Sequence, residues 1–484
     1  MPDAHFSTCP HFVQGDRPAL KSRLRRVHSR MLDDAVAADP LQVARRHTEP
    51  VRSALAQGSG MIRGALSKLF NWANQPLCSG WERARFMLVL ALVIDVRIPN
   101  VWTQGRFWAE EGTVFFRKAW NLPWWEALLA PHAGYLNLVG NAAALLAAHL
   151  TTLRAAPYVT TTIGVIIQCL PAMLLSTSRD KWLQSRLVLV IASAVIVCAP
   201  VPEEVWANSA DSHFHLALCV GLILAIETQS GVMGKVHGCV ILLAALSGPA
   251  AWSLIPLYAL RAVLDRSKPR ALQGLMLLLG AMIQIAFFAG LGSRDSSASP
   301  SVLGAIVLAK HVLTPLLGHR LASAPVADLR HQFESGSGPL WPLALVVILF
   351  AIAFVAAASR PTKAPLWLLV ASLMLAATAY LGSLGQKIDL ISVVGGGRYA
   401  FAPQVLIGLA LLSWTVIYPG RLRVLSGLIL VWIVGVGGWN YFVPTFPDAM
   451  AGPVWRDEVE DWQSDPRRPL QIWPTGWTMR LSAR

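Results

Sequence analysis

The stretch RFMLVLALVIDVRIPNV, residues 85–101, decides the fold, because it is the first of many apolar runs in the chain. About eleven such runs, each of roughly 15 to 25 residues, recur from Phe86 to Val443, and a run of about 18 residues with few charges is typical of a transmembrane helix. Unpaired backbone groups are very costly in lipid and no alternating strand pattern is present, so the spans should be helices. We predict an all-α, polytopic membrane protein with about 11–13 transmembrane helices in a lipid bilayer.

Composition and charge favour the same class. Of the 484 residues 54% are hydrophobic and 14% are charged, against about 25% charged residues in an ordinary soluble domain. The formal net charge of +14 lies largely in the first 86 residues and in short loops, and the 19 Trp suit a membrane–water interface. Short basic loops are typical of the cytoplasmic side, which places residues 261–270, 359–365 and 419–423 there. We expect no nucleic-acid partner. The six Cys contain no CxxC pair, which indicates packing instead of a metal site or disulfide framework.

Three regions follow from this pattern. Residues 1–85 carry 13 Lys and Arg against 7 Asp and Glu and lack the apolar segment of a signal peptide, so we expect a basic, poorly ordered or amphipathic cytoplasmic extension. A start at Met61 is the alternative. Residues 86–442 form the transmembrane helical domain, with residues 102–132 as its first outward loop. Residues 443–484 form an outward tail rich in Trp.

Two parts of the membrane domain allow more than one arrangement. Residues 293–338 form an outward loop only if the apolar stretch 302–317 lies along the interface, which its Lys310 and His311 indicate. Between the first outward loop and residue 261 an odd number of crossings is needed, and five simple spans satisfy this: 133–153, 157–176, 186–200, 213–229 and 237–260. The alternative that we prefer breaks the last span at Gly248–Pro249, since Pro suits the first turn of a new helix, and residues 133–176 then cross once.

The outward loop contains GRFWAEEGTVFFRKAWNLPWW, residues 105–125, with two adjacent acids in an aromatic segment. One interpretation is that Glu110 and Glu111 are solvated loop residues. The other is catalytic, because a carboxylate just outside the bilayer can act as general base on a hydroxyl that attacks a membrane-anchored phosphate compound. Such a site also needs a cation or a metal ion at the departing phosphate.

Other polar residues adjoin the spans, where they are costly and therefore candidates for function. In NSADSHFHLAL, residues 208–218, Asp211 and His213 could join the glutamates around a divalent cation, and His215 could contact a phosphate; the alternative is that they cap a helix. In GQKIDLISVVGGGRYAFAP, residues 385–403, a Gly run precedes a predicted helix start, which favours anion binding; the alternative is that Arg398 and Tyr399 anchor the helix at the membrane interface after a flexible turn. The candidate ligand-binding residues are Asn208, Asp211, His213, His215, Lys387, Arg398, Tyr399, His132 and Tyr135.

Several motifs together resemble a bacterial family of multi-spanning membrane proteins whose shape is similar to the GT-C glycosyltransferases. The motifs are FWAEEG…FF…A (107–119), PHAGYLNL (131–138), VWANSADSHFHLAL (205–218), SGPAAWSLIPLYALR (247–261), GGGRYAFAP (395–403) and IWPTGWTM (472–479). The resemblance covers residues 86–484 by scattered motifs. It implies a multi-pass protein of the bacterial inner membrane with a cytoplasmic N-terminus.

The resemblance also implies a function. The chain would transfer a sugar from a polyprenyl-phosphate donor to an unknown acceptor outside the membrane, with Glu110 and Glu111 as catalytic acids and Glu110, Glu111 and Asp211 as ligands of a divalent cation. The family more often has Glu-Asp at this position, and it tends to have Pro-Arg where this chain has Gly140–Asn141. The alternatives are a transporter or flippase for a polar or lipid-linked sugar, or a polysaccharide polymerase or ligase.

Overall fold

The computed structural model describes residues 64, 66–200, 203–288, 298–359, 362–383, 386–443 and 450–483. The chain divides into two compact units, Met1–Ala73 and Asn74–Arg484. The described part of the first unit is helical, and residues 1–63 and 65 of the predicted basic extension lie outside the described residues.

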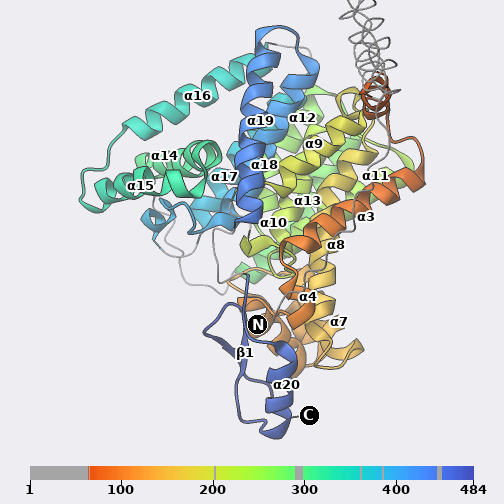
Figure 1. Ribbon diagram of the computed structural model, residues 1–484, viewed down its shortest axis with the longest axis vertical. Helices are drawn as coiled ribbons and strands as arrows, with labels where there is room; N and C mark the ends of the chain where they lie inside the picture. Colours follow the sequence, from red (N-terminus) through yellow and green to blue (C-terminus); the bar gives the residue numbers. More distant parts are fainter. Residues whose placement is uncertain are drawn as a thin grey trace, which may run out of the picture. The chain divides into compact units, whose positions relative to one another are not determined.

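Helices build most of the second unit (Figure 1). Its first half contains α3 (Gly80–Arg97), α4 (Asn100–Gln104), the π-helix η1 (Glu111–Phe116), α5 (Arg117–Asn121), α6 (Trp124–Leu129), α7 (Leu138–Leu150), α8 (Ala156–Thr177), η2 (Lys181–Leu183), α9 (Arg186–Val197), η3 (Glu203–Val205), α10 (Ser212–Ala225), α11 (Gly231–Ser247), η4 (Ala250–Leu254) and α12 (Ile255–Leu264). The second half contains α13 (Lys268–Phe288), α14 (Pro300–Val307), the π-helix η5 (Leu308–Leu313), α15 (Thr314–Glu334), α16 (Trp341–Ala358), α17 (Ala364–Gly382), η6 (Lys387–Leu390), α18 (Gly397–Ile417), α19 (Arg421–Phe442), α20 (Trp455–Ser464) and the strands β1 (Leu470–Ile472) and β2 (Trp477–Met479).

Seven helical segments of the described residues are long and apolar enough to cross a membrane: α8, α13, the continuous segment from α14 to α15, α16, α17, α18 and α19. The prediction of an all-α, polytopic membrane protein is confirmed. The seven are fewer than the predicted 11–13 spans, because several apolar runs form helices of only 10–17 residues. At about 1.5 Å per residue such helices are shorter than a bilayer core of about 30 Å.

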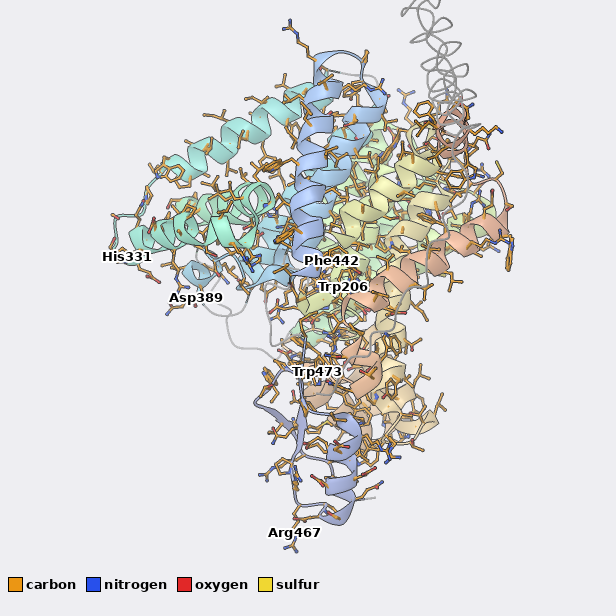
Figure 2. All side chains as sticks on the ribbon, in the orientation of Figure 1. Trp206, His331, Asp389, Phe442, Arg467 and Trp473 are labelled. Carbon is orange, nitrogen blue, oxygen red and sulfur yellow. The ribbon has the colours of Figure 1, made fainter. Side chains whose placement is uncertain are left out.

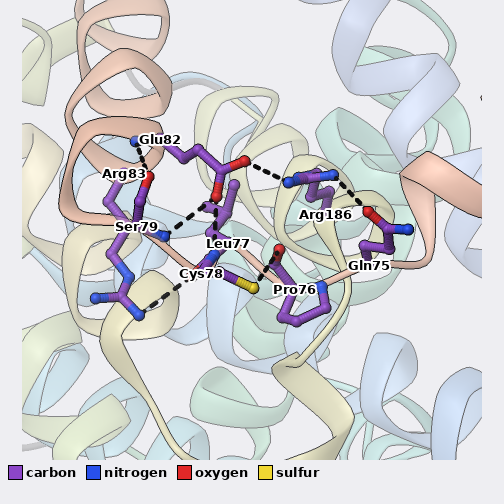
Figure 3. A network of polar contacts seen from close by, with 8 residues as sticks. All are labelled: Gln75, Pro76, Leu77, Cys78, Ser79, Glu82, Arg83 and Arg186. Carbon is purple, nitrogen blue, oxygen red and sulfur yellow. Dashed lines mark hydrogen bonds and ion pairs between the residues drawn. The ribbon is translucent and has the colours of Figure 1, made fainter.

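Helix α3 begins earlier than the apolar run that predicts it. Ser79 accepts a hydrogen bond from the Glu82 N–H (3.0 Å), and the Glu82 carboxylate accepts one from the Ser79 N–H (3.2 Å), which is a capping box (Figure 3). Arg186 at the start of α9 pairs with the same carboxylate at 2.5 Å. This contact joins the beginnings of α3 and α9. The helix ends at Arg97, since Pro99 disfavours helical backbone at the residue before it.

The break predicted at Gly248–Pro249 is present. Helix α11 ends at Ser247, Gly248 has extended backbone, and Pro249 precedes η4. A Cβ on Gly248 would lie 3.0 Å from His213 Cβ, so a residue without a side chain allows the break to approach the start of α10.

Helix α10 lies in the centre of the unit, and all of its residues are buried. Its last carbonyls accept hydrogen bonds from two arginines: Arg261 binds the Leu224 carbonyl, and Arg270 binds the carbonyls of Ile223 and Ile226. Cations at a helix C-terminus offset its partial negative charge. At the opposite end, α10 begins at Ser212, and Asp211 is its N-cap residue.

Lys310 and His311 were the reason to expect residues 302–317 along the membrane interface, and that reason is wrong because both side chains are buried. Lys310 is 1% exposed, and its ammonium donates to the carbonyls of Val393 (3.2 Å) and Gly395 (2.6 Å). His311 Nε2 and the Tyr380 hydroxyl lie 2.7 Å apart. Both residues are thus held inside the protein. Helices α14 and α15 run across the direction of α18 and α19 (Figure 1), and the interfacial position of the segment stays a prediction.

The C-terminal tail folds onto the first predicted outward loop. Trp473 N–H donates to the Phe107 carbonyl (3.1 Å), and Ala109 N–H donates to the Trp473 carbonyl (2.5 Å). Ile472 packs on η1 so closely that a Cβ on Gly112 would lie 2.8 Å from it. Trp473 lies where the tail meets the rest of the unit (Figure 2). The tail thus supports the first outward loop, residues 102–132, which we call the acidic loop.

Candidate functional site

A cavity of about 360 Å³ collects segments from across the sequence. Its walls come from Glu110, the turn at residues 132–137, the start of α10, the break at Pro249, the end of α17 and the start of α18. Of the predicted site residues, seven line this cavity: Glu110, His132, Tyr135, Asp211, His213, Arg398 and Tyr399. We refer to it as the acidic cavity.

The two adjacent glutamates point to different surroundings. Glu110 is partly exposed and lines the acidic cavity. Glu111 is 1% exposed, and its Oε1 accepts hydrogen bonds from the Ser209 N–H (2.9 Å) and hydroxyl (2.5 Å). Its Oε2 accepts one from the Trp108 N–H at 3.3 Å. Burial raises the pKa of Glu111, and the bonds from Ser209 oppose that rise. Glu111 therefore holds the loop in place.

Arg106 supports the same region from the other side. It is 1% exposed and donates to the carbonyls of Trp206 (2.5 Å) and Ala207 (2.9 Å). Its guanidinium also lies 6.0 Å from the ring centre of Trp473 in the tail. Burial lowers the pKa of Arg106 to about 10, against the attraction of Glu111 and Asp211. Arg106 thus connects the tail, the acidic loop and the turn before α10.

Asp211 is the second carboxylate of the acidic cavity. It is 7% exposed and accepts a hydrogen bond from Asn208 Nδ2 at 2.8 Å. Burial raises its pKa to about 7. The positive charge of Arg398 opposes this rise, and the negative charges of Glu204, Glu110 and Glu111 add to it. A carboxyl group with a pKa near neutral can change its charge at physiological pH.

Arg398 supplies the positive charge of the acidic cavity. Its Nε lies 4.0 Å from Glu204 Oε2, and its backbone N–H donates to the same carboxylate at 3.3 Å. The guanidinium carbon lies 5.3 Å from the ring centre of Tyr399. One quarter of the Arg398 side chain (25%) stays exposed, so the guanidinium remains accessible to a ligand.

His132 and His213 complete the polar wall. The backbones of His132 and Tyr135 exchange two hydrogen bonds (2.9 and 3.1 Å), which closes a tight turn. The ring centres of Tyr135 and His213 lie 5.8 Å apart, and His213 Nδ1 lies 3.1 Å from the Ala210 carbonyl. Burial lowers the pKa of His132, and the charge of Glu110 opposes this change. The lowered pKa favours a neutral imidazole.

Four predicted site residues lie outside the acidic cavity: Glu111, Asn208, His215 and Lys387. His215 is 1% exposed, and its Nε2 lies 3.0 Å from the Val205 carbonyl. Lys387 donates to the Ser383 carbonyl (2.6 Å) and hydroxyl (3.2 Å). Asn208 orients Asp211 from behind. None of the four is among the lining residues of the acidic cavity, and their ligand-binding roles stay predictions.

The metal site predicted at Glu110, Glu111 and Asp211 is not assembled. The described residues contain no group of three or more His, Cys, Asp or Glu side chains that could hold a metal ion. The physical reason is that Glu111 turns away to Ser209. Arg398 is the one Lys or Arg side chain among the described residues that line the acidic cavity.

Sequence reasoning missed Glu204 and Ser209, which bind the predicted site residues Arg398 and Glu111. Glu204 stands in the acidic segment PEEVWANSAD, which was a usable signal; a lone serine such as Ser209 gives none. The end of α17, with Thr378, Ala379 and Leu381 on the cavity, was also missed, because apolar residues of a span look alike in sequence.

Comparison with known proteins found no matching family, no matching curated protein and no matching solved structure.

Proposed function

We propose that this multi-pass membrane protein is a glycosyltransferase that transfers a sugar from a polyprenyl-phosphate donor to an acceptor on the non-cytoplasmic face of a bacterial inner membrane. One observation carries the proposal: Glu110, Asp211 and Arg398, far apart in sequence, line one cavity. A base for a hydroxyl and a cation for a phosphate are the two groups that such a transfer requires. The resemblance of the motifs to GT-C glycosyltransferases supports the same reaction.

Glu110 acts as the general base. Its carboxylate takes the proton of an acceptor hydroxyl, whose oxygen attacks the anomeric carbon of the donor sugar. The bond between that carbon and the phosphate oxygen breaks, and its electron pair leaves with the phosphate. We assign this role to Glu110 and not to Glu111, because Glu111 does not line the acidic cavity and accepts hydrogen bonds from Ser209 and Trp108.

Arg398 stabilises the departing phosphate. A guanidinium can bind two phosphate oxygens at once, and Arg398 lies in the first turn of α18, where the helix N-terminus also favours an anion. Lys310 binds the carbonyls of Val393 and Gly395 and so fixes the loop before this helix. Where the GT-C-like family tends to have Arg, Asn141 binds the carbonyls of Leu128 and Ala130, so Arg398 is left as the phosphate-binding cation.

Apolar residues of the same cavity suit a lipid-linked donor. Leu381 and Ala379 from α17 and Phe214 from α10 form its apolar wall. Since α17 is a candidate membrane span, a prenyl chain in the bilayer would bring its phosphate to this depth.

The proposal is tested with the purified full chain in detergent micelles, a polyprenyl-phosphate hexose labelled in the prenyl chain, and a bacterial cell-envelope extract that supplies the acceptor. We expect release of free polyprenyl phosphate, reduced at least about 100-fold by Glu110→Gln. Glu126→Gln on the exposed surface of α6 is the matched control and should leave release unchanged. Equal release by the Glu110→Gln variant would contradict the proposal, and transport of intact donor across proteoliposomes without release would indicate a flippase.

A further inference from the structure

Glu204 lies beside Arg398 without lining the acidic cavity. Its Oε2 accepts a hydrogen bond from the Arg398 backbone N–H at 3.3 Å and lies 4.0 Å from the Arg398 Nε. This N–H belongs to the first turn of α18, where a helix has no internal acceptor for its N–H groups. Glu204 therefore already interacts with the two groups, the guanidinium and the helix N-terminus, that the proposed function assigns to a phosphate.

The contacts between Glu204 and Arg398 are long. Charge-assisted hydrogen bonds usually measure about 2.7–2.9 Å, which is shorter than both distances. One third of the Glu204 side chain (33%) is exposed, together with one quarter of Arg398 (25%). Such a pair does little to fix the geometry of an arginine, but its charge still lowers the attraction of the guanidinium for a second anion. We therefore expect Glu204 to act through its charge.

The backbone around Glu204 is held in place. The neighbouring Glu203 is 1% exposed and pairs with Arg97 at 3.5 Å, and the guanidinium carbon of Arg97 lies 4.4 Å from the ring centre of Trp206. The Glu204 carbonyl accepts a hydrogen bond from Asn208 Nδ2 at 3.1 Å. These contacts keep Glu204 at the start of α18, so its charge is a fixed part of the site.

The phosphate gains a negative charge in the proposed transfer. The donor is a phosphodiester with one negative charge, and cleavage of its bond to the sugar leaves a phosphomonoester, whose second pKa is about 6. Above that pH the product is mostly a dianion. Arg398 is the one Lys or Arg among the described lining residues, whereas two carboxylates, Glu110 and Asp211, line the same cavity. The second charge of the product therefore meets no second Lys or Arg among these residues.

We propose that Glu204 sets the phosphate specificity of the acidic cavity, because it makes the cavity bind a phosphodiester in preference to a phosphomonoester. The inference rests on the proposed function, in which Arg398 binds the donor phosphate. The Glu204 carboxylate offsets part of the charge of Arg398, and it repels a dianion about twice as strongly as a monoanion at the same distance. The product is thus held less tightly than by an unopposed arginine, and it leaves the cavity to the next donor.

The test measures binding of two probes, monododecyl phosphate and methyl dodecyl phosphate, to the purified full chain in micelles of an uncharged detergent. At about pH 8 the probes differ by one negative charge, and neither carries a sugar. Only binding that Arg398→Gln abolishes is counted. We expect Glu204→Gln to tighten binding of the monoester at least about 10-fold and binding of the diester about 3-fold.

The matched control is Glu227→Gln, which removes the same charge at an exposed position just after the opposite end of α10 and should change neither affinity. Weaker or unchanged binding of the monoester in Glu204→Gln would overturn the proposal, because a residue that only positions Arg398 does not tighten binding when it is lost. An equal change for the two probes would also overturn it, as would the absence of any binding that depends on Arg398.

A second variant keeps the test decisive if Glu204→Gln fails to fold. Glu204→Ala removes the carboxylate without adding an amide that could bond Arg398, and it should shift the preference toward the monoester in the same direction; no shift would overturn the proposal. The binding assay requires no sugar transfer, so it separates this inference from the proposed function. Donor cleavage without the shift would leave the transferase and overturn the role of Glu204, whereas the shift without donor cleavage would support that role and contradict the transferase.

Discussion

Glu111 and Ser209, 98 residues apart in the chain, are joined by two hydrogen bonds to one carboxylate oxygen, at 2.9 and 2.5 Å. These bonds connect the acidic loop to the turn before α10. Because Glu110 and Asp211 lie one and two residues away from this connection, it sets how the two carboxylates of the acidic cavity face each other. The arrangement of the acidic cavity thus depends on Glu111, which does not itself line the cavity.

The first prediction concerns this connection. Glu111→Ala would leave the Ser209 N–H and hydroxyl and the Trp108 N–H without their acceptor in a buried region, so we expect a loss of about 3 kcal/mol in the free energy of unfolding. Thermal unfolding followed by the reactivity of the buried Cys219 thiol measures it. The partly exposed Glu110→Ala is the control, with an expected change within about 0.5 kcal/mol. A control variant as unstable as Glu111→Ala would contradict the different roles of the two acids.

The second prediction concerns Arg398. Arg398→Lys keeps a positive charge but loses the planar fork that binds two phosphate oxygens, so we expect KM for the donor to rise about 10-fold. Arg398→Gln removes the charge as well and should lower kcat by a further factor of about 100. Steady-state kinetics of donor cleavage separate the two effects. Arg330→Lys, at an exposed ion pair, is the matched control, and an equal change in that variant would contradict a phosphate-binding role for Arg398.

The third prediction follows from the pKa of Asp211, which burial raises from 3.8 to about 7. Between these pH values the folded protein retains a proton that the unfolded chain has lost, so the contribution of Asp211 to stability falls as pH rises through this window. Asp211→Asn has no such proton, and the amide oxygen can still accept from Asn208. The variant should therefore gain stability relative to the native protein from pH 5 to pH 7, by roughly 1.4 kcal/mol per pH unit.

Melting temperatures of both proteins at intervals across this range check the prediction. We expect their difference to change steadily up to about pH 7 and to stay constant above it. A difference independent of pH would show that Asp211 is already ionised at pH 5.

Hydropathy and local backbone chemistry predicted much of the fold. The apolar runs predicted the helices, because the bilayer requires long apolar segments with internal hydrogen bonds. The break at Gly248–Pro249 was predicted because Pro begins helices more readily than it continues them. The start of α3 was missed by five residues, since the capping box of Ser79 and Glu82 lies in polar sequence before the apolar run.

The candidate site was predictable only as a set of residue types. The pattern of acids and cations beside the spans named Glu110, Asp211 and Arg398, which share one cavity. It could not separate Glu110 from Glu111, because the difference depends on Ser209, which is remote in sequence. Lys387 and His215 looked equally suitable, but each is already bound to a nearby carbonyl. Tertiary partners of this kind leave no local pattern in a single sequence.

The last prediction concerns the tail. Trp473 is 1% exposed, its indole N–H donates to the Pro453 carbonyl at 3.0 Å, and its backbone bonds Phe107 and Ala109 in the acidic loop. Trp473→Ala removes this packing, and we expect a loss of about 3–5 kcal/mol, shared between the tail and the loop. Trypsin should then cleave after Arg467 at least 10-fold faster.

Mass spectrometry of the released C-terminal peptide measures that rate. Trp477→Ala, whose native side chain is 39% exposed, is the matched control and should be cleaved at the native rate. Because the acidic loop carries Glu110, Trp473→Ala should also lower kcat for donor cleavage, although Trp473 does not line the acidic cavity. Faster proteolysis with an unchanged kcat would show that the tail folds independently of the loop. That result would contradict the claim that Trp473 holds Glu110 in position.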